Sequence, residues 1–110
     1  MPTASEAAVL RIHIDYNDVY QGRPLADALI LKAQELHLAA ALAIEGIIGY
    51  SRSPLTHSIE LILARDRPVV VELVDRRERL DAYIAAVEPM LPAVNATIEP
   101  VTLLRFGTFA

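Results

Sequence analysis

Cysteine is absent from the 110 residues of the chain, and this absence excludes disulfide bonds and thiolate chemistry. The first residues lack the basic start and the apolar run of a secretory signal. No apolar stretch reaches the roughly 20 residues that cross a membrane, because Glu45 and Glu72 interrupt the longest ones. The sequence therefore predicts a soluble, cytoplasmic protein with a flexible terminus over residues 1–8 and one domain over residues 9–110.

Lysine is nearly absent as well, since nine of the ten basic side chains are arginine and the net charge is −4. An acidic chain without a basic, aromatic-rich surface is not typical of proteins that bind nucleic acids. The forked guanidinium of arginine suits fixed contacts to carboxylate or phosphate groups. We therefore expect no nucleic-acid partner, and we expect anion contacts where arginines gather.

The chain also lacks the two glycine-rich nucleotide motifs, the loop that ends in Gly-Lys and the Gly-x-Gly-x-x-Gly turn. Its histidines, His13, His37 and His57, are 24 and 20 positions apart, so no close pair of metal ligands exists. We predict no metal site and no catalytic residue. His57, between the hydroxyls of Thr56 and Ser58, is the histidine that we assign to ligand binding.

Apolar periodicity predicts four strands and two helices in the order β-α-β-β-α-β. The strands are expected over residues 9–16, 39–50, 68–74 and 98–106, the first helix over residues 24–37, and the second from Asp75 to Pro89 or Pro92. The alanines of residues 39–50 would also suit a helix, but the β-branched residues and two glycines favour a strand. Asp75 and Glu78 are spaced as a capping box, and Pro100 restricts the last strand to an edge or a bulge.

This order of elements is typical of the α+β, ferredoxin-like βαββαβ sandwich, an antiparallel sheet with two helices on one face. The open face of such a sheet should carry polar residues at alternate positions. Instead, residues 41–48 and 69–74 are nearly continuous apolar runs, and 54% of the chain is apolar. Both faces of the sheet need cover, so we expect an oligomer.

Charged side chains occur at two unusual places in this pattern. Glu45 and Glu72 interrupt apolar strands, and we expect them to pair with arginines across strands or subunits rather than to act as an acid–base pair. Arg76, Arg77 and Arg79 open the second helix, where cations are unfavourable. We expect them to form a solvated charged face with salt bridges between subunits, and an anion from elsewhere is the alternative.

Four stretches of the chain resemble the PII-like superfamily and, within it, the domain of unknown function 190 family. They are Leu-Arg-Ile-His-Ile at 10–14, Tyr-Gln-Gly-Arg-Pro-Leu at 20–25, Glu-Gly-Ile-Ile-Gly-Tyr at 45–50, and residues 63–75 around Asp-Arg-Pro-Val-Val-Val-Glu-Leu-Val-Asp. The resemblance covers about residues 9–107. It implies a PII-like homotrimer whose sheets face inward and whose helices face outward.

The resemblance also implies a ligand site in clefts between subunits, at the base of the loop that follows the second of the four predicted strands. The positions that match this site are Gly49, Tyr50, Ser51 and Arg52 at the loop base and Arg105 in the last strand. Arg105 is similar to the second of two phosphate-facing arginines in PII proteins, and Leu103 stands in place of the first. Residues 92–98 lack the glycines and the lysine of the PII phosphate loop. The implied ligand is an adenine nucleotide or another small anion.

The function that the resemblance implies is signal transduction by a regulatory protein that is not itself inserted in a membrane. The ligand would order the loop over residues 50–58, and this loop would contact a membrane transporter or an enzyme. Two other interpretations remain open. One is a small ferredoxin-like enzyme of isomerase or hydrolase type that uses His57 with a carboxylate, and the other is a structural oligomer without a ligand.

Overall fold

The structure is a computed structural model that describes residues 1–46 and 67–108. These residues form six strands and three helical segments. Their bounds, in chain order, are β1 (Thr3–Asp15), β2 (Val19–Tyr20), β3 (Arg23–Pro24), α1 (Leu25–Glu35), β4 (Ala40–Glu45), β5 (Pro68–Asp75), α3 (Arg77–Val87), the 3-10 helix η1 (Glu88–Met90) and β6 (Asn95–Arg105). The predicted order of four main strands and two helices is confirmed, and the segment after residue 39 is a strand.

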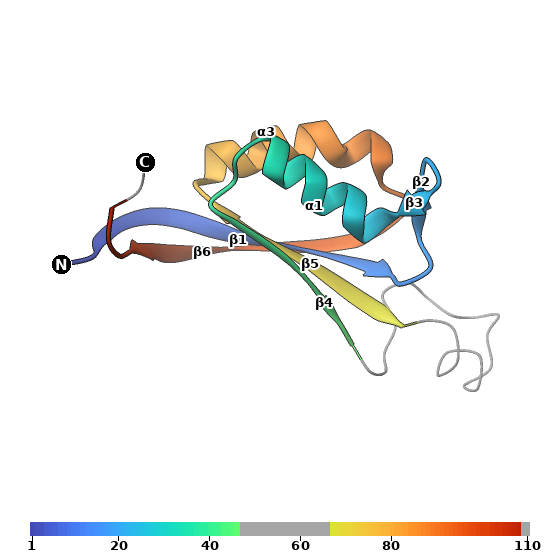
Figure 1. Cartoon of the computed structure of the whole chain (residues 1–110), viewed down its shortest axis with the longest axis horizontal. Coiled ribbons are helices and arrows are strands. Elements are labelled where there is room, and N and C mark those ends of the chain that lie inside the picture. The colour runs from blue at the N-terminus through green and yellow to red at the C-terminus, as the bar shows by residue number, and fades with distance from the viewer. Residues whose placement is uncertain (47–66, 109–110) are drawn as a thin grey trace.

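The four long strands form one antiparallel sheet in the order β4-β5-β1-β6. Both α1 and α3 lie on the same face of this sheet, and the described residues leave its other face bare (Figure 1). This arrangement is the ferredoxin-like fold that the element order predicts. β6 lies at the edge of the sheet, as Pro100 in its middle requires.

The core lies between the sheet and the two helices, because strand residues at alternate positions point to opposite faces. β5 follows this alternation although its sequence is almost wholly apolar: Val69, Val71 and Leu73 are buried, while Val70 and Val74 are partly exposed. The other large side chains with less than 2% exposure are Ile12, Ile14, Leu25, Leu29, Leu80, Tyr83 and Val87. The chain therefore builds one core, on one face only.

Helix α1 is bounded by local geometry at both ends. The small β2–β3 hairpin precedes it, with a two-residue turn in which Gln21 and Gly22 both have positive φ angles, of 49° and 80°. At the far end His37 adopts a positive φ of 56°, and the amide of Leu38 donates to the carbonyl of Ala33. This bonding ends the helix in a Schellman motif, with histidine where glycine is more common.

Two strand bounds differ from the sequence prediction. β1 begins at Thr3, so most of the terminus predicted as flexible over residues 1–8 lies in a strand, and β6 begins at Asn95 rather than at residue 98. The cause is mutual pairing, because β1 and β6 pair continuously from Thr3 to His13 on the β1 side. β5 ends opposite Ala8, so residues 3–7 and their β6 partners form a two-stranded ribbon beyond the sheet (Figure 1).

Glycine is required where β4 ends. The amide of Gly46 donates to the carbonyl of Pro68 at 2.7 Å, and a Cβ atom at position 46 would lie 2.7 Å from the Cγ atom of Pro68. Any larger residue would force the two strands apart. This glycine therefore allows the end of β4 to lie against Pro68 at the start of β5.

Over the described ranges, no helix is long and apolar enough to span a membrane. Both α1 and α3 have 11 residues.

Candidate functional site

Most of the predicted ligand residues fall outside the described part of the chain. Gly49, Tyr50, Ser51, Arg52 and His57 all belong to residues 47–66. Arg105 is described, and it is the last residue of β6.

Arg105 lies on the two-stranded ribbon, where it pairs with Thr3 of β1, and Leu103 pairs with Ser5. Residues that face each other in an antiparallel pair point to the same side. These four side chains line a cavity of about 420 Å³ at the end of the sheet. The other lining residues are His37, Asp75, Arg76 and Arg79. The structure thus gathers three arginines and one histidine around the strand position that sequence resemblance selects.

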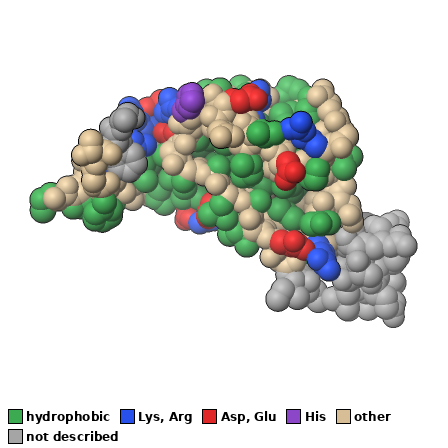
Figure 2. Space-filling model, in the orientation of Figure 1, with side chains coloured by type: hydrophobic (Ala, Val, Ile, Leu, Met, Phe, Trp, Pro, Cys, Tyr) green, Lys and Arg blue, Asp and Glu red, His purple; other side chains and the backbone are tan. Residues whose placement is uncertain are grey.

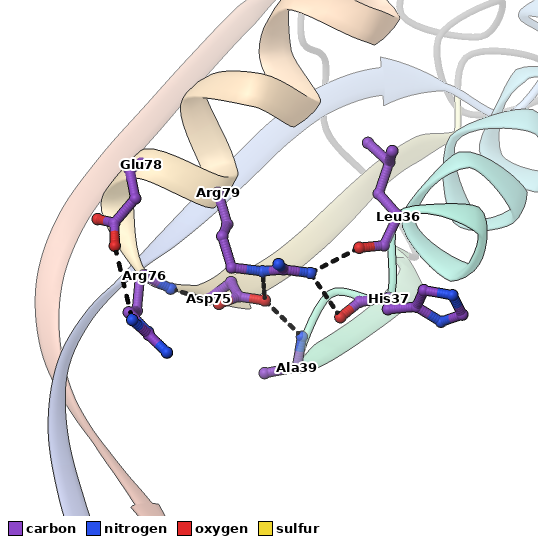
Figure 3. A network of polar contacts seen from close by, with 7 residues as sticks. All are labelled: Leu36, His37, Ala39, Asp75, Arg76, Glu78 and Arg79. Carbon is purple, nitrogen blue, oxygen red and sulfur yellow. Dashed lines mark hydrogen bonds and ion pairs between the residues drawn. The ribbon is translucent and has the colours of Figure 1, made fainter.

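Asp75 organises one wall of this cavity (Figure 3). Its side chain accepts hydrogen bonds from the amides of Ala39 and Arg76, at 2.9 and 2.7 Å, and from Nε of Arg79 at 3.1 Å. Arg79 in turn donates to the carbonyls of Leu36 and His37. Asp75 is only 4% exposed, so these bonds satisfy a buried carboxylate and join the start of α3 to the end of α1 and the start of β4.

The predicted capping box is wrong. The N-cap of α3 is Arg76, with no side-chain cap hydrogen bond, and Asp75 is the last residue of β5. Asp75 points into the junction with Ala39 instead, because a buried carboxylate gains more from an amide and a guanidinium than from a solvent-exposed helix end. Glu78 lies 3.9 Å from the guanidinium of Arg76.

The three arginines at the start of α3 have different partners within the chain. Arg79 is held by Asp75, and Arg77 pairs with Asp81 one turn later at 3.0 Å. Within residues 1–46 and 67–108, Arg76 has only the 3.9 Å contact with Glu78, and its side chain is 65% exposed. In Figure 2, acidic and basic side chains gather near a histidine toward this end of the molecule. Of the three arginines at the start of α3, Arg76 is therefore the one that no close ion pair holds in place.

The open face of the sheet carries a charged cluster at its centre. Arg11 on β1 donates to Glu72 on β5 at 2.9 Å and to Glu99 on β6 at 2.5 Å. The bonds to Glu99 and Glu72 raise the pKa of Arg11 above its ordinary value. Glu45 pairs with Arg67 at 2.8 Å, and the bond to Glu45 likewise raises the pKa of Arg67. Both glutamates therefore pair with arginines across strands, as the sequence predicts.

Around this charged cluster the open face is apolar. Leu42 pairs with Glu72, and Ile44 with Val70, so these side chains share the face of Arg11. Leu42 is 46% exposed and Ile44 is 50% exposed. Apolar surface of this kind on a sheet is unusual unless something covers it.

The residues that flank residues 47–66 lie far from Arg105. Gly46 and Arg67 adjoin the end of β1 near Asp15, whereas Arg105 pairs with Thr3 at the other end of the same strand. β1 has 13 residues, and at about 3.3 Å per residue its ends are roughly 40 Å apart. The described residues that flank residues 47–66 therefore lie at the opposite end of β1 from Arg105.

The described residues contain no group of three or more histidine, cysteine or acidic side chains that could hold a metal ion. Sequence reasoning missed the cavity residues Thr3, Ser5, His37 and Arg76. The available signal was the run of arginines at the start of the second helix, whose cations do not suit a helix N-terminus. The run of arginines in the sequence could not show that the two-stranded ribbon brings Arg105 to the same cavity.

Comparison with known proteins agrees with this fold. The model of the family DUF190, described as "Uncharacterized ACR", matches residues 7–103. A UPF0166 protein from Aquifex aeolicus is 27% identical over 81 residues, which cover 73% of this chain and 77% of that protein.

Two solved structures of CPII, a nitrogen regulatory PII-like protein from Thiomonas intermedia, have a similar fold. The apo form has a TM-score of 0.61 at 8% identity, and the match covers 96% of this chain and 99% of the CPII chain. A form bound to ADP, AMP and bicarbonate has a TM-score of 0.56 at 7% identity, and the match covers 93% of this chain and 90% of the CPII chain. At such low identity the likeness concerns the fold. From its family match and its backbone, the chain belongs to the DUF190 family and has the PII-like, ferredoxin-like fold.

Proposed function

We propose that this protein is a cytoplasmic, PII-like, homotrimeric regulator that binds a small anionic ligand in clefts between its chains. The ligand is an adenine nucleotide or a small anion. It contacts Gly49, Tyr50, Ser51, Arg52 and His57 of one chain and Arg105 of the next. Binding orders the loop over residues 50–58, and this loop then binds or releases a transporter or an enzyme, an order–disorder switch of a common type.

The separation of Arg105 from the loop ends is the observation that carries this proposal. Arg52 is six residues from Gly46, and six residues of chain span at most about 20 Å. The distance along β1 to Arg105 is roughly twice that length. This separation favours a site in which the two arginines come from different chains.

The open face of the sheet supports the assembly. Leu42 and Ile44 are about half exposed beside partly exposed Val70 and Val74. Burial of such a surface against copies of itself is stabilising by roughly 25 cal/mol per Å² of apolar area. Arg11 is already paired with Glu72 and Glu99 within the chain, so it can enter an interface without becoming an isolated cation, and the cluster keeps a formal charge of −1.

The comparison with CPII supports the class of ligand. That protein, which shares the fold, has been solved with ADP, AMP and bicarbonate. The arginine-lined cavity beside Arg105 is chemically suited to the phosphate or carboxylate groups of such molecules.

Mixed assemblies test the two-chain site. Arg52→Ala and Arg105→Ala should each abolish the thermal stabilisation that ADP, AMP or bicarbonate gives the wild-type protein, because each removes one half of every cleft. The two variants are then unfolded, mixed and refolded together. Each mixed trimer has one cleft with Arg52 from one chain and Arg105 from its neighbour, so binding should return in part.

Each variant refolded alone is the control and should not recover binding. If the mixture stays inactive while both kinds of chain are shown to assemble together, the site does not lie between chains. If neither substitution changes binding of any of the three ligands, the proposed ligand residues are wrong.

A further inference from the structure

We infer that Arg76, together with Arg79, completes the anion site of Arg105 and makes it selective for a doubly charged phosphate or diphosphate group. This inference rests on the proposed function, because it concerns the same ligand site. It adds two residues that come from the start of α3 rather than from the last strand, and it narrows the class of ligand.

The first argument is spatial. Arg76, Arg79 and Arg105 line one cavity of about 420 Å³, together with the hydroxyl-bearing Thr3 and Ser5. This volume lies within the usual range of ligand pockets, about 300–1,000 Å³. The ribbon supplies Arg105 and the hydroxyls from one side, and the start of α3 supplies the other two arginines from the opposite side. A phosphate group in this cavity would have donors on two sides.

The second argument is the balance of charge. The lining contains three guanidinium groups, which stay protonated in proteins, and one carboxylate, that of Asp75. Asp75 is turned toward Arg79 and two backbone amides. Over the described lining residues, these groups therefore have a formal charge of +2, not counting His37. A phosphate monoester or diphosphate, with a charge near −2 or beyond at neutral pH, matches it, whereas bicarbonate supplies a single charge.

The third argument concerns the cost of Arg76 to the helix. A cation at the N-terminus of a helix is destabilising because it opposes the positive end of the helix dipole. Arg77 and Arg79 offset this cost through Asp81 and Asp75. Among the described residues, Arg76 has only its 3.9 Å contact with Glu78, which does not line the cavity. Arg76 does not stabilise the helix, and we infer that its role is to bind an anion.

Arg79 differs from Arg76 because it is fixed before any ligand arrives. Its bonds to Asp75, to the carbonyl of Leu36 and to the carbonyl of His37 hold the guanidinium in one place. Arg79 therefore supplies a positive charge in a fixed position, while the exposed side chain of Arg76 is free to move toward the anion. Pre-ordering of this kind lowers the entropic cost of binding.

Calorimetric titration of the full chain with pyrophosphate, ADP and bicarbonate at constant ionic strength tests the inference. We expect pyrophosphate and ADP to bind more tightly than bicarbonate. Arg76→Gln should weaken pyrophosphate and ADP by at least about tenfold, since it removes a charge-assisted contact, and it should change bicarbonate binding far less.

Arg77→Gln is the matched control. It removes the same charge one residue away, but Arg77 does not line this cavity, so affinities should stay within about twofold of wild type. Arg76 is exposed and makes no bond that holds the fold, and circular dichroism should confirm that both variants are folded. Arg76→Lys should restore part of the affinity, because it restores the charge without the fork.

The outcomes separate this inference from the proposed function. If Arg105→Ala and Arg52→Ala abolish binding and Arg76→Gln does not weaken it, the two-chain site stands and this inference is overturned. If Arg76→Gln and Arg105→Ala both weaken pyrophosphate and Arg52→Ala does not, the cavity binds phosphate as inferred, without the loop. Equal loss in Arg77→Gln and Arg76→Gln overturns the inference, because only general charge then matters. Bicarbonate binding that equals pyrophosphate binding overturns the assigned class of ligand.

Discussion

The two faces of the sheet are built from the same four strands, but they have opposite surroundings. On the helix-covered face, Ile12, Val71 and Leu73 are 1% exposed or less. On the open face, Leu42 and Ile44 are about half exposed around the cluster of Arg11 with Glu72 and Glu99. The difference shows that a single chain buries the apolar strand residues of one face only. We propose that copies of the chain cover the apolar residues of the open face.

Removal of a core side chain from the covered face should have the largest effect on stability. Leu73→Ala deletes a fully buried side chain, and it should lower the free energy of unfolding by about 2–5 kcal/mol. Chemical denaturation followed by circular dichroism measures this loss. Leu31→Ala, at a position that is 39% exposed on α1, is the control and should cost less than about 1 kcal/mol. Equal losses would show that the covered face is not the core.

Asp75 is the buried carboxylate of the covered side, and its loss should have the next largest effect. Asp75→Ala leaves the amide of Ala39 and Nε of Arg79 without their acceptor. We expect a loss of about 1.5–3 kcal/mol in the free energy of unfolding, the range for hydrogen bonds to charged groups. Asp75→Asn keeps one acceptor oxygen and should lose less. A neutral result for Asp75→Ala would mean that this junction does not hold α1, β4 and α3 together.

Tyr83 gives a smaller and pH-dependent effect. Its buried hydroxyl donates to the carbonyl of Leu29 at 2.8 Å, and Tyr83→Phe should cost about 0.5–1.5 kcal/mol at neutral pH. Burial raises the pKa of Tyr83 above its ordinary value. The folded chain therefore holds this proton more tightly than the unfolded chain, so the contribution is complete below pH 10 or so and declines as the pH rises further.

Denaturation of wild type and Tyr83→Phe between pH 8 and 11 or so measures this decline. The difference in stability between the two proteins should shrink above the ordinary tyrosine pKa of about 10. A difference that stays constant across this range would show that the hydroxyl is not buried as the structure has it.

Sequence reasoning predicted the fold well because the fold depends on local patterns. Alternation in β1, helical spacing in α1 and the proline positions mark elements that neighbouring residues determine. The bounds of β1 and β6 were missed because they depend on pairing between residues 82 or more positions apart, from His13 with Asn95 to Thr3 with Arg105. The capping box was wrong because the partner of Asp75 is the amide of Ala39, which no local pattern reveals.

The candidate site was predictable only in part, for the same reason. Resemblance selected Arg105, and the helix-start arginines were noticeable because their charge opposes the helix dipole. Only the three-dimensional arrangement places Arg76, Arg79 and Arg105 around one cavity. The predicted residues at 49–52 and His57 lie outside the described residues and stay predictions.

The central claim is that copies of this chain cover the open face of the sheet, and light scattering after size-exclusion chromatography tests it most directly. We predict that the wild-type protein has the mass of three 12.1 kDa chains. Leu42→Glu, which places a charge in the middle of the proposed interface, should reduce that mass to one chain while circular dichroism shows the same fold. A wild-type protein with the mass of a single chain at micromolar concentration would contradict the account.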